Sequence, residues 1–337
     1  MAAVDVNTYN MKEFQFALKP EAAVGTKLNT SMQLLQLAGD VTVSKEVIQD
    51  TTQRAGVGRT MKVADVHTTD KGGVRTTLSV PVVLDTTVDT MILEGLTWVE
   101  TGASPSSVDI AYDYAPSALA HGGAPSATNI GTFTACMISP IANESRYWVG
   151  ACIEAATISM DIGTDGGRRT ATLTIVTEYY EEDAAAAPTG MSAYGATYRY
   201  LYELGTTKTI GGDVMVMNKL ELTITNAVSY FGFQGSNGDP EGVQRAVSGG
   251  RIEIAATAGV KYDSNTAEHW QNQRAGTIFA LELSNNATWA SATFGLKADY
   301  CKLNAEVVPG DTDQGAFQDL SFIIGASTSG DVIQIVP

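Results

Sequence analysis

Long runs of alternating apolar and polar residues constrain the fold of this chain most. The alternation runs through residues 74–84, 214–228 and 252–262, and glycine-rich turn clusters separate such runs. Successive side chains of a strand point to opposite faces, so this period predicts long strands with one buried face. Helical patterning is confined to two short segments, roughly residues 86–95 and 265–274. The sequence therefore predicts an all-β, mainly antiparallel fold.

A change of composition near residue 185 predicts a domain boundary. Acidic residues crowd residues 178–183, four alanines follow at 184–187, and Pro188-Thr189-Gly190 comes next. Passages of this kind are typical of linkers between domains. The chain has 337 residues, and single hydrophobic cores stop growing at about 250–300 residues. Two domains are therefore expected.

The two halves share an order of elements that suggests an internal duplication. Each half reads as two strands, a short helix, a further strand and then a hairpin. We therefore expect two tandem β-sandwich or barrel modules, each with one short flanking helix, over residues 31–185 and 186–337. An N-terminal arm would occupy residues 1–30, and the first module would carry a long insert at residues 98–130.

The net charge limits the partners that the chain can hold. It carries 21 Lys and Arg against 37 Asp and Glu, a formal charge of −16. Such a chain cannot grip DNA by neutralising phosphates, although DNA could pass along it without sticking. No apolar run approaches the ~18 residues of a membrane span, so no membrane partner is expected. The N-terminus lacks a signal-peptide pattern, and three cysteines indicate synthesis in a reducing compartment rather than a disulfide scaffold.

No motif in the sequence indicates catalysis or a cofactor. The histidines His67, His121 and His269 have no partner at metal-ligand spacing, and no Gly-x-Ser-x-Gly elbow occurs. Residues 161–166 approach a calcium loop but place glycine where the second oxygen ligand belongs. We therefore expect a protein that is not an enzyme, with no catalytic residues, no metal site and no cofactor.

Aromatic residues in or beside turn-rich segments are candidates for contacts between subunits. They are Tyr112, Tyr114, Tyr230, Phe231 and Phe233. Aromatic side chains exposed on loops are often buried against a partner. The alternative is that they pin their own loops to the domain, and the sequence leaves both interpretations open.

Two segments resemble the tail tube proteins of tailed, siphophage-type bacteriophages. In residues 147–177 an aromatic residue, a glycine and a small residue (Trp148, Gly150 and Ala151) lead into a long hairpin with a glycine-rich turn. Residues 218–262 look like the matching part of a second tail-tube module. The resemblance covers most of residues 30–325, by pattern rather than by an invariant motif.

The resemblance implies a structural virion protein, a major tail protein built into the phage tail. In that family, six modules form a ring, inner sheets join edge to edge around a channel, and rings stack into a tube. A chain with two modules would need three copies per ring, a pseudo-hexameric trimer. Its partners would be other copies of itself and the neighbouring tape measure, tail terminator and distal tail proteins. It would be assembled in the bacterial host cytoplasm. DNA would transit on genome ejection without specific binding. The arm, the insert and a loop over residues 230–250 are the candidates for bridging stacked rings.

Acidic residues placed by strand parity are candidates for the channel lining. They are Asp40, Glu46, Glu221 and Glu253. Carboxylates in the channel would repel phosphates and let DNA slide. The alternative for each of the four is an ordinary solvated charge on the outer surface.

Two other classes of protein compete with the tail tube interpretation. A tandem β-sandwich of a virion or cell surface, such as an adhesin, would bind carbohydrate through loop aromatics. A β-rich hydrolase would need a cleft centred on a histidine or on paired acids, which a broad hydrolase screen would detect.

Overall fold

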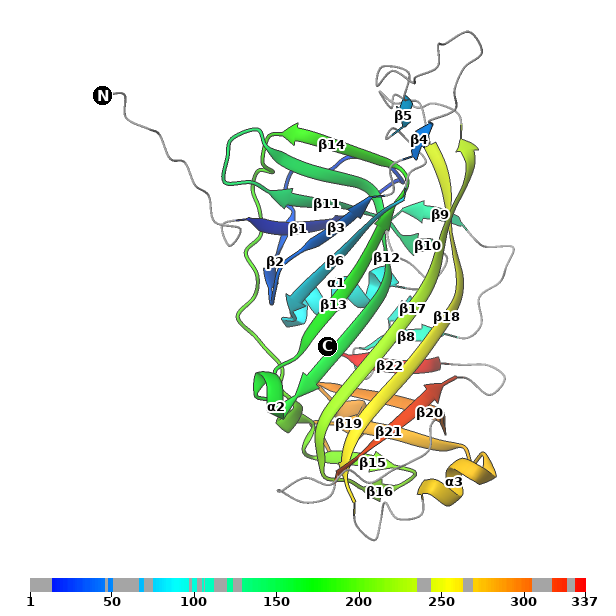
Figure 1. The fold of residues 1–337 in the computed structure, drawn as a ribbon. Coiled ribbons are helices and arrows are strands. Elements are labelled where there is room, and N and C mark those ends of the chain that lie inside the picture. The colour runs from blue at the N-terminus through cyan, green and yellow to red at the C-terminus, as the bar shows by residue number, and fades with distance from the viewer. Residues whose placement is uncertain are drawn as a thin grey trace, which may run out of the picture.

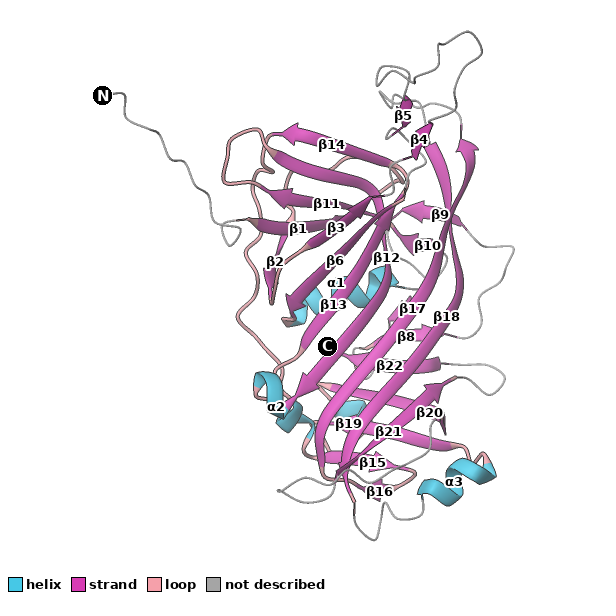
Figure 2. Ribbon diagram, in the orientation of Figure 1, coloured by secondary structure: helices cyan, strands magenta, loops and turns pink. Residues whose placement is uncertain are grey.

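The computed structural model describes residues 14–45, 48–50, 67–69, 75–96, 99–101, 105, 107–111, 120–123, 129–234, 244–262, 269–304, 317–325 and 331–337. Most of these residues are strands, and the α-helices among them are three short ones (Figure 2). Nearly all pairings are antiparallel, which confirms the predicted all-β class.

The N-terminal half contains the strands from β1 to β14 and two helices. Their bounds are β1 Gln15–Pro20, β2 Gln33–Leu37, β3 Thr42–Lys45, β4 Ile48–Asp50, β5 His67–Thr69, β6 Thr76–Val83, α1 Thr86–Leu96, β7 Val99–Thr101, β8 Val108–Ala111, β9 Ala120–Gly123, β10 Asn129–Gly131, β11 Phe133–Ile138, β12 Ser145–Asp161, α2 Ile162–Asp165, β13 Thr170–Thr177 and β14 Tyr180–Ala185.

The C-terminal half follows an irregular linker, residues 186–200. Its elements are the 3₁₀-helix η4 Leu201–Leu204, β15 Thr207–Ile210, β16 Asp213–Val214, β17 Met217–Gln234, β18 Gln244–Lys261, α3 His269–Ala275, β19 Phe279–Ser284, the 3₁₀-helix η5 Trp289–Ser291, β20 Gly295–Leu303, β21 Phe317–Ile324 and β22 Asp331–Val336.

One sheet layer runs without interruption through both halves. Its strands lie side by side in the order β3, β6, β13, β12, β17, β18 and β21 (Figure 1). We call this layer the long sheet. The junction between the halves is the antiparallel pairing of β12 with β17, from Ala155 opposite Thr225 to Asp161 opposite Lys219. The halves thus share a sheet rather than forming two separate sandwiches.

Strand pairings recur in the two halves in the same order. In the N-terminal half, β1–β2, β1–β11, β11–β12, β12–β13, β12–β14, β6–β13 and β3–β6 are antiparallel pairs. In the C-terminal half, the pairs β15–β16, β15–β19, β19–β20, β20–β21, β20–β22, β18–β21 and β17–β18 follow the same scheme. Each strand in these pairs therefore has a counterpart, such as β1 and β15, β3 and β17, β11 and β19, or β12 and β20. The pattern is compatible with duplication, and the division into two tandem modules stays a prediction.

Helix α1 is buried inside the molecule. Asp85 precedes it, and its Oδ1 accepts hydrogen bonds from the backbone N–H groups of Thr87 and Val88, which satisfies donors at the helix start. At the other end, the Asn226 side chain on β17 donates to the Leu96 carbonyl over 2.8 Å. Apolar residues of α1 join one core cluster that extends from Phe16 to Ile335, so the halves also share a core.

Backbone groups of the linker and of Leu201 after it are hydrogen-bonded to the N-terminal half. The Gly195 N–H donates to Asp85 Oδ2 over 2.9 Å, and the Arg169 N–H donates to the Arg199 carbonyl over 2.8 Å. The Leu201 N–H then donates to the Gly167 carbonyl over 2.7 Å. These bonds fix the path of the chain between β14 and β15.

Parts of the three segments expected to bridge rings are strands, and whether these segments bridge rings stays a prediction. Residues 15–20 of the predicted arm form β1, where Phe16, Ala17 and Leu18 are completely buried; residues 1–13 lie outside the described residues. The predicted 230–250 loop is largely strand, because β17 runs to Gln234 and β18 starts at Gln244. Within the insert, β8 pairs with β22 and extends the sheet of the C-terminal half.

Candidate functional site on the long sheet

The exposed face of the long sheet carries rows of hydroxyl side chains that cross the junction between the halves. In one row, Thr172, Thr157 and Thr223 lie opposite one another on β13, β12 and β17. The opposite face packs into the core through residues such as Leu173 and Leu222. Threonine suits such a position because it is β-branched and yet polar.

A second row and a third row flank this one. The second contains Thr42, Ser79, Thr174, Ala155, Thr225 and Glu253. The third contains Thr170, Ser159, Glu221, Thr257 and Ser321. Neighbouring hydroxyl groups approach at 3.5 Å between Thr157 and Thr223 and at 3.3 Å between Thr257 and Ser321. The face is therefore mostly neutral and polar.

The acidic residues Glu221 and Glu253 share this face. Glu221 lies opposite Thr257 and Glu253 opposite Thr225, so one register places both side chains on the same side. Lys219 Nζ lies 3.6 Å from Glu221 Oε2, which offsets part of that charge. Asp319 on β21 lies opposite Gly259 and is exposed on the same face. Sequence reasoning missed Asp319, although it alternates with the buried Leu320 and Phe322.

Arg75, directly before β6, and Glu154 on β12 form an ion pair beside this face. Arg75 Nη2 lies 2.5 Å from Glu154 Oε1, at the bulge where the register of β12 shifts against β13. Partial burial lowers the pKa of Arg75, but the hydrogen bond to Glu154 and its negative charge raise that pKa by more, so the net shift is upward. The charges of Arg75 and Glu154 therefore cancel, and the remaining charges of the face include Lys219 and Lys261 as well as Glu221, Glu253 and Asp319.

The other predicted channel residues do not join this group. Asp40 is exposed in the connection between β2 and β3, where strand parity has no meaning. Glu46 lies outside the described residues. The structure thus brings together two of the four acidic candidates.

The predicted interface residue Tyr230 is an internal contact. Its side chain is 9% exposed, and its hydroxyl lies 2.8 Å from the carbonyl oxygens of both Gly150 and Val176. It therefore links β17 to β12 and β13 within one chain, in line with the alternative that such aromatic residues make internal contacts. Phe231 and Phe233 belong to β17, and their side chains lie outside the description, as do Tyr112 and Tyr114.

A buried ion pair lies where α1, the linker and the C-terminal half meet. Arg169, just before β13, contacts the carboxylate of Asp89 on α1, and both side chains are almost completely buried. Burial raises the pKa of Asp89 to about 6, although the positive charge of Arg169 opposes the shift. Arg169 and Arg199 both lie over the Phe294 ring, at 5.5 and 5.3 Å from its centroid.

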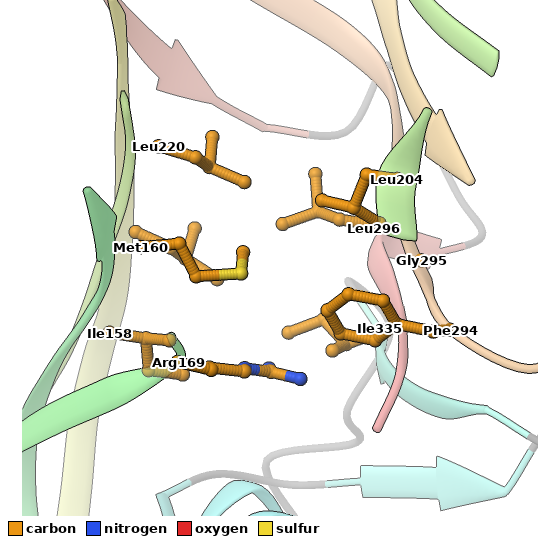
Figure 3. A pocket seen from close by; sticks show the side chains of 10 residues that line it. Ile158, Met160, Arg169, Leu204, Leu220, Phe294, Gly295, Leu296 and Ile335 are labelled. Carbon is orange, nitrogen blue, oxygen red and sulfur yellow. The ribbon is translucent and has the colours of Figure 1, made fainter. Parts of the chain in front are cut away.

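The Arg169 side chain also points into a small cavity between the sheet layers (Figure 3). Ile158, Met160 and Leu220 line it from the long sheet, and Leu296 and other apolar residues line it from the opposite layer. Its volume of ≈ 20 Å³ is room for a single water molecule. The cavity is too small for an organic substrate.

A much larger groove of ≈ 860 Å³ opens on the N-terminal half. One part of its lining is the start of β1 together with residues 35–41, which form the end of β2 and the β2–β3 connection. The rest is the end of β11, the β11–β12 turn and Tyr194 of the linker. The lining is mixed, with apolar side chains beside Asp40, Glu144 and Arg146.

Comparison with known proteins gives no identification. No protein-family model matches the chain, and no curated protein matches it significantly. In the part of the chain that the structure describes, no helix is long and apolar enough to cross a membrane. Over those same residues, no group of three or more His, Cys, Asp or Glu is arranged to hold a metal ion.

Proposed function

We propose that the chain is the structural subunit of a phage tail tube. Copies join head to tail into rings, the rings stack, and the exposed face of the long sheet lines the channel. In this proposal the protein catalyses nothing and needs no cofactor.

The β12–β17 junction is the observation that carries the proposal. β20 is the counterpart of β12, and β3 is the counterpart of β17. The β12–β17 pairing within one chain is therefore a joint between two halves, and β20 and β3 are the strands that could form the same joint between two chains. The same joint between β20 of one copy and β3 of the next extends the sheet from molecule to molecule. A head-to-tail contact of this kind generates rings or filaments.

Both strands that this joint needs have an open edge. Among the described residues, β3 pairs only with β6, and Lys302 and Leu303 of β20 pair only with β21. Val43 of β3 is an apolar side chain with 39% exposure. Unpaired edges are templates for pairing with another chain. Three copies with two halves each would give six repeats around a ring.

The chemistry of the exposed face supports passage of DNA. Hydroxyl groups hydrogen-bond weakly to any passing phosphate, and Glu221, Glu253 and Asp319 repel it. Such a surface does not hold a polyanion in place. The tape measure, tail terminator and distal tail proteins would contact the ends and the interior of the tube, and the site of action would be the virion.

Electron microscopy of the purified protein tests the assembly. We expect stacked rings, and two proline variants probe the β3 edge. Successive N–H groups of a strand point to opposite sides, so Val43→Pro and Ser44→Pro differ in which side loses a donor. The proline variant that removes the donor on the open side of β3 should keep the thermal stability of the wild-type protein and lose ring formation. The control Tyr202→Ser, at an exposed residue of η4, should keep ring formation. Monomers of the wild-type protein at high concentration would contradict the proposal.

Charge reversal tests the channel. Glu221→Lys with Glu253→Lys should make assembled tubes retain DNA in a salt-dependent manner. Glu144→Lys with Asp183→Lys adds the same charge away from this face and should not. Equal retention by both double variants would show that the exposed face does not line the channel.

A further inference from the structure

The groove on the N-terminal half is too large to be a packing defect. Its ≈ 860 Å³ is the volume of a short peptide segment rather than of a few water molecules. Two large apolar side chains at its rim, Ile141 and Tyr194, are 42% and 49% exposed. Exposed apolar surface of this kind marks a site that something covers.

The counterpart position in the C-terminal half is filled. There η4 precedes β15 and packs against β17 and β19. Its Leu201 and Leu204 are 1% and 2% exposed. The chain after η4 is fastened to the end of β19 and the turn that follows, through the Gly205–Ser284 bridge and the Thr206 hydroxyl, which donates to the Asn285 carbonyl over 3.1 Å.

The two positions correspond element by element. β15 is the counterpart of β1, β19 that of β11, and the β16–β17 connection that of the β2–β3 connection. The groove is lined by the start of β1, the end of β11, the β11–β12 turn and the β2–β3 connection. It is therefore the place where the counterpart of η4 belongs.

We propose that the segment directly before β1, residues 4–13, fills this groove in the same molecule. Phe14, the first described residue, itself lines the groove, so the segment is tethered at its entrance. A tether of this length keeps the segment at an effective concentration in the millimolar range. The proposal rests on the recurrent strand pairings and the groove, and it is independent of the tail tube function.

The composition of the segment fits the lining. It contains the apolar residues Val4, Val6, Tyr9 and Met11, which suit a groove with Leu35, Leu37 and Met137. Lys12 is opposite in charge to Asp40 and Glu144 of the lining, and Asp5 and Glu13 are opposite in charge to Arg146. In the groove, these apolar residues cover one end of the core, as Leu201 and Leu204 do in the C-terminal half.

Hydrogen exchange of the full chain tests the proposal. We expect the amides of residues 35–41 and 137–146 to exchange about ten-fold faster in a variant that lacks residues 2–12. A synthetic peptide of residues 1–13 should restore the protection, and a scrambled peptide of the same composition should not. Exchange that is equal with and without residues 2–12 overturns the proposal.

Two double substitutions keep the test decisive if the truncated chain does not fold. Tyr9→Asp with Met11→Asp places charges in the apolar groove and should remove the protection. Asn7→Asp with Asn10→Asp adds the same charge at polar positions and should keep it. Equal effects of the two pairs overturn the role of the apolar side chains. Protection of the wild-type groove that grows with protein concentration would assign the groove to a second copy and overturn filling within one molecule.

Discussion

Gly150 lies where β12 changes partners, and an added methyl group there should be costly. Up to Ala151, β12 pairs with β11 and β14; from Cys152 it pairs with β13 and later with β17. Gly150 has a φ of +61°, and a Cβ on it would lie 2.8 Å from Cγ and 2.9 Å from Cβ of Tyr179. Those distances are well inside van der Waals contact, so Gly150→Ala requires either the strand corner or the Tyr179 ring to shift.

Two costs add up for Gly150→Ala. A left-handed backbone costs an L-residue about 1–2 kcal/mol, and overpacking of a close-packed site costs about 1–3 kcal/mol. The free energy of unfolding should therefore fall by about 2–5 kcal/mol. Gly166→Ala is the matched control, because Gly166 has a φ of +63° but no atom within 4 Å of its added Cβ. It should show the backbone cost alone.

Urea unfolding followed by circular dichroism measures both variants. Gly150→Ala should lower the free energy of unfolding by clearly more than Gly166→Ala does. A cost no larger than that of the control would refute the reasoning, because it would mean that the contact with Tyr179 relaxes freely. A cost for Gly166→Ala as large as that of Gly150→Ala would refute it equally.

The remaining predictions concern buried polar groups. Tyr230→Phe leaves buried carbonyl groups without their hydroxyl partner and should lower the free energy of unfolding by about 1–3 kcal/mol; an unchanged urea midpoint would contradict the internal role of Tyr230. Burial raises the pKa of Asp89 to about 6, so the folded state takes up a proton first on acidification. The wild-type protein should therefore gain about 1 kcal/mol relative to Asp89→Asn between pH 7 and pH 5, and parallel pH profiles of the two proteins in urea unfolding would speak against it. Burial also raises the pKa of the thiols of Cys136, Cys152 and Cys301 to about 12. A thiol reagent at pH 8 should label none of them in the native protein and all three in denaturant, and stoichiometric labelling of the native protein would exclude this.

Alternation in the sequence was sufficient to predict individual strands. The runs around residues 74–84 and 252–262 became β6 and β18, and most of the run 214–228 became β17, because a half-buried strand must place apolar residues on one parity. The start of that run differs from the prediction, because Val214 belongs to the short strand β16 and both Val214 and Val216 are exposed. Pairing between distant strands leaves no such local trace. The β12–β17 junction and the addition of β8 to β22 therefore could not be read from the sequence.

The same limit explains the outcome for the candidate site. Parity placed Glu221 and Glu253 on the polar sides of their own strands, and only the register of β17 against β18 shows that these sides coincide. Tyr230 shares the parity of the buried Ile224 and Val228, a signal that predicts its burial better than its position near a turn does. Asp40 lies in a connection, where no periodic pattern applies.

The β12–β17 junction also has a kinetic consequence. For any head-to-tail assembly of this chain, every second joint forms during folding, between strands of one polypeptide. Such a joint needs no encounter between molecules and forms at the high effective concentration of a tethered partner. A ring of given size then requires half as many joints between molecules as a ring built from separate halves. Register errors between molecules can arise at only half of its joints.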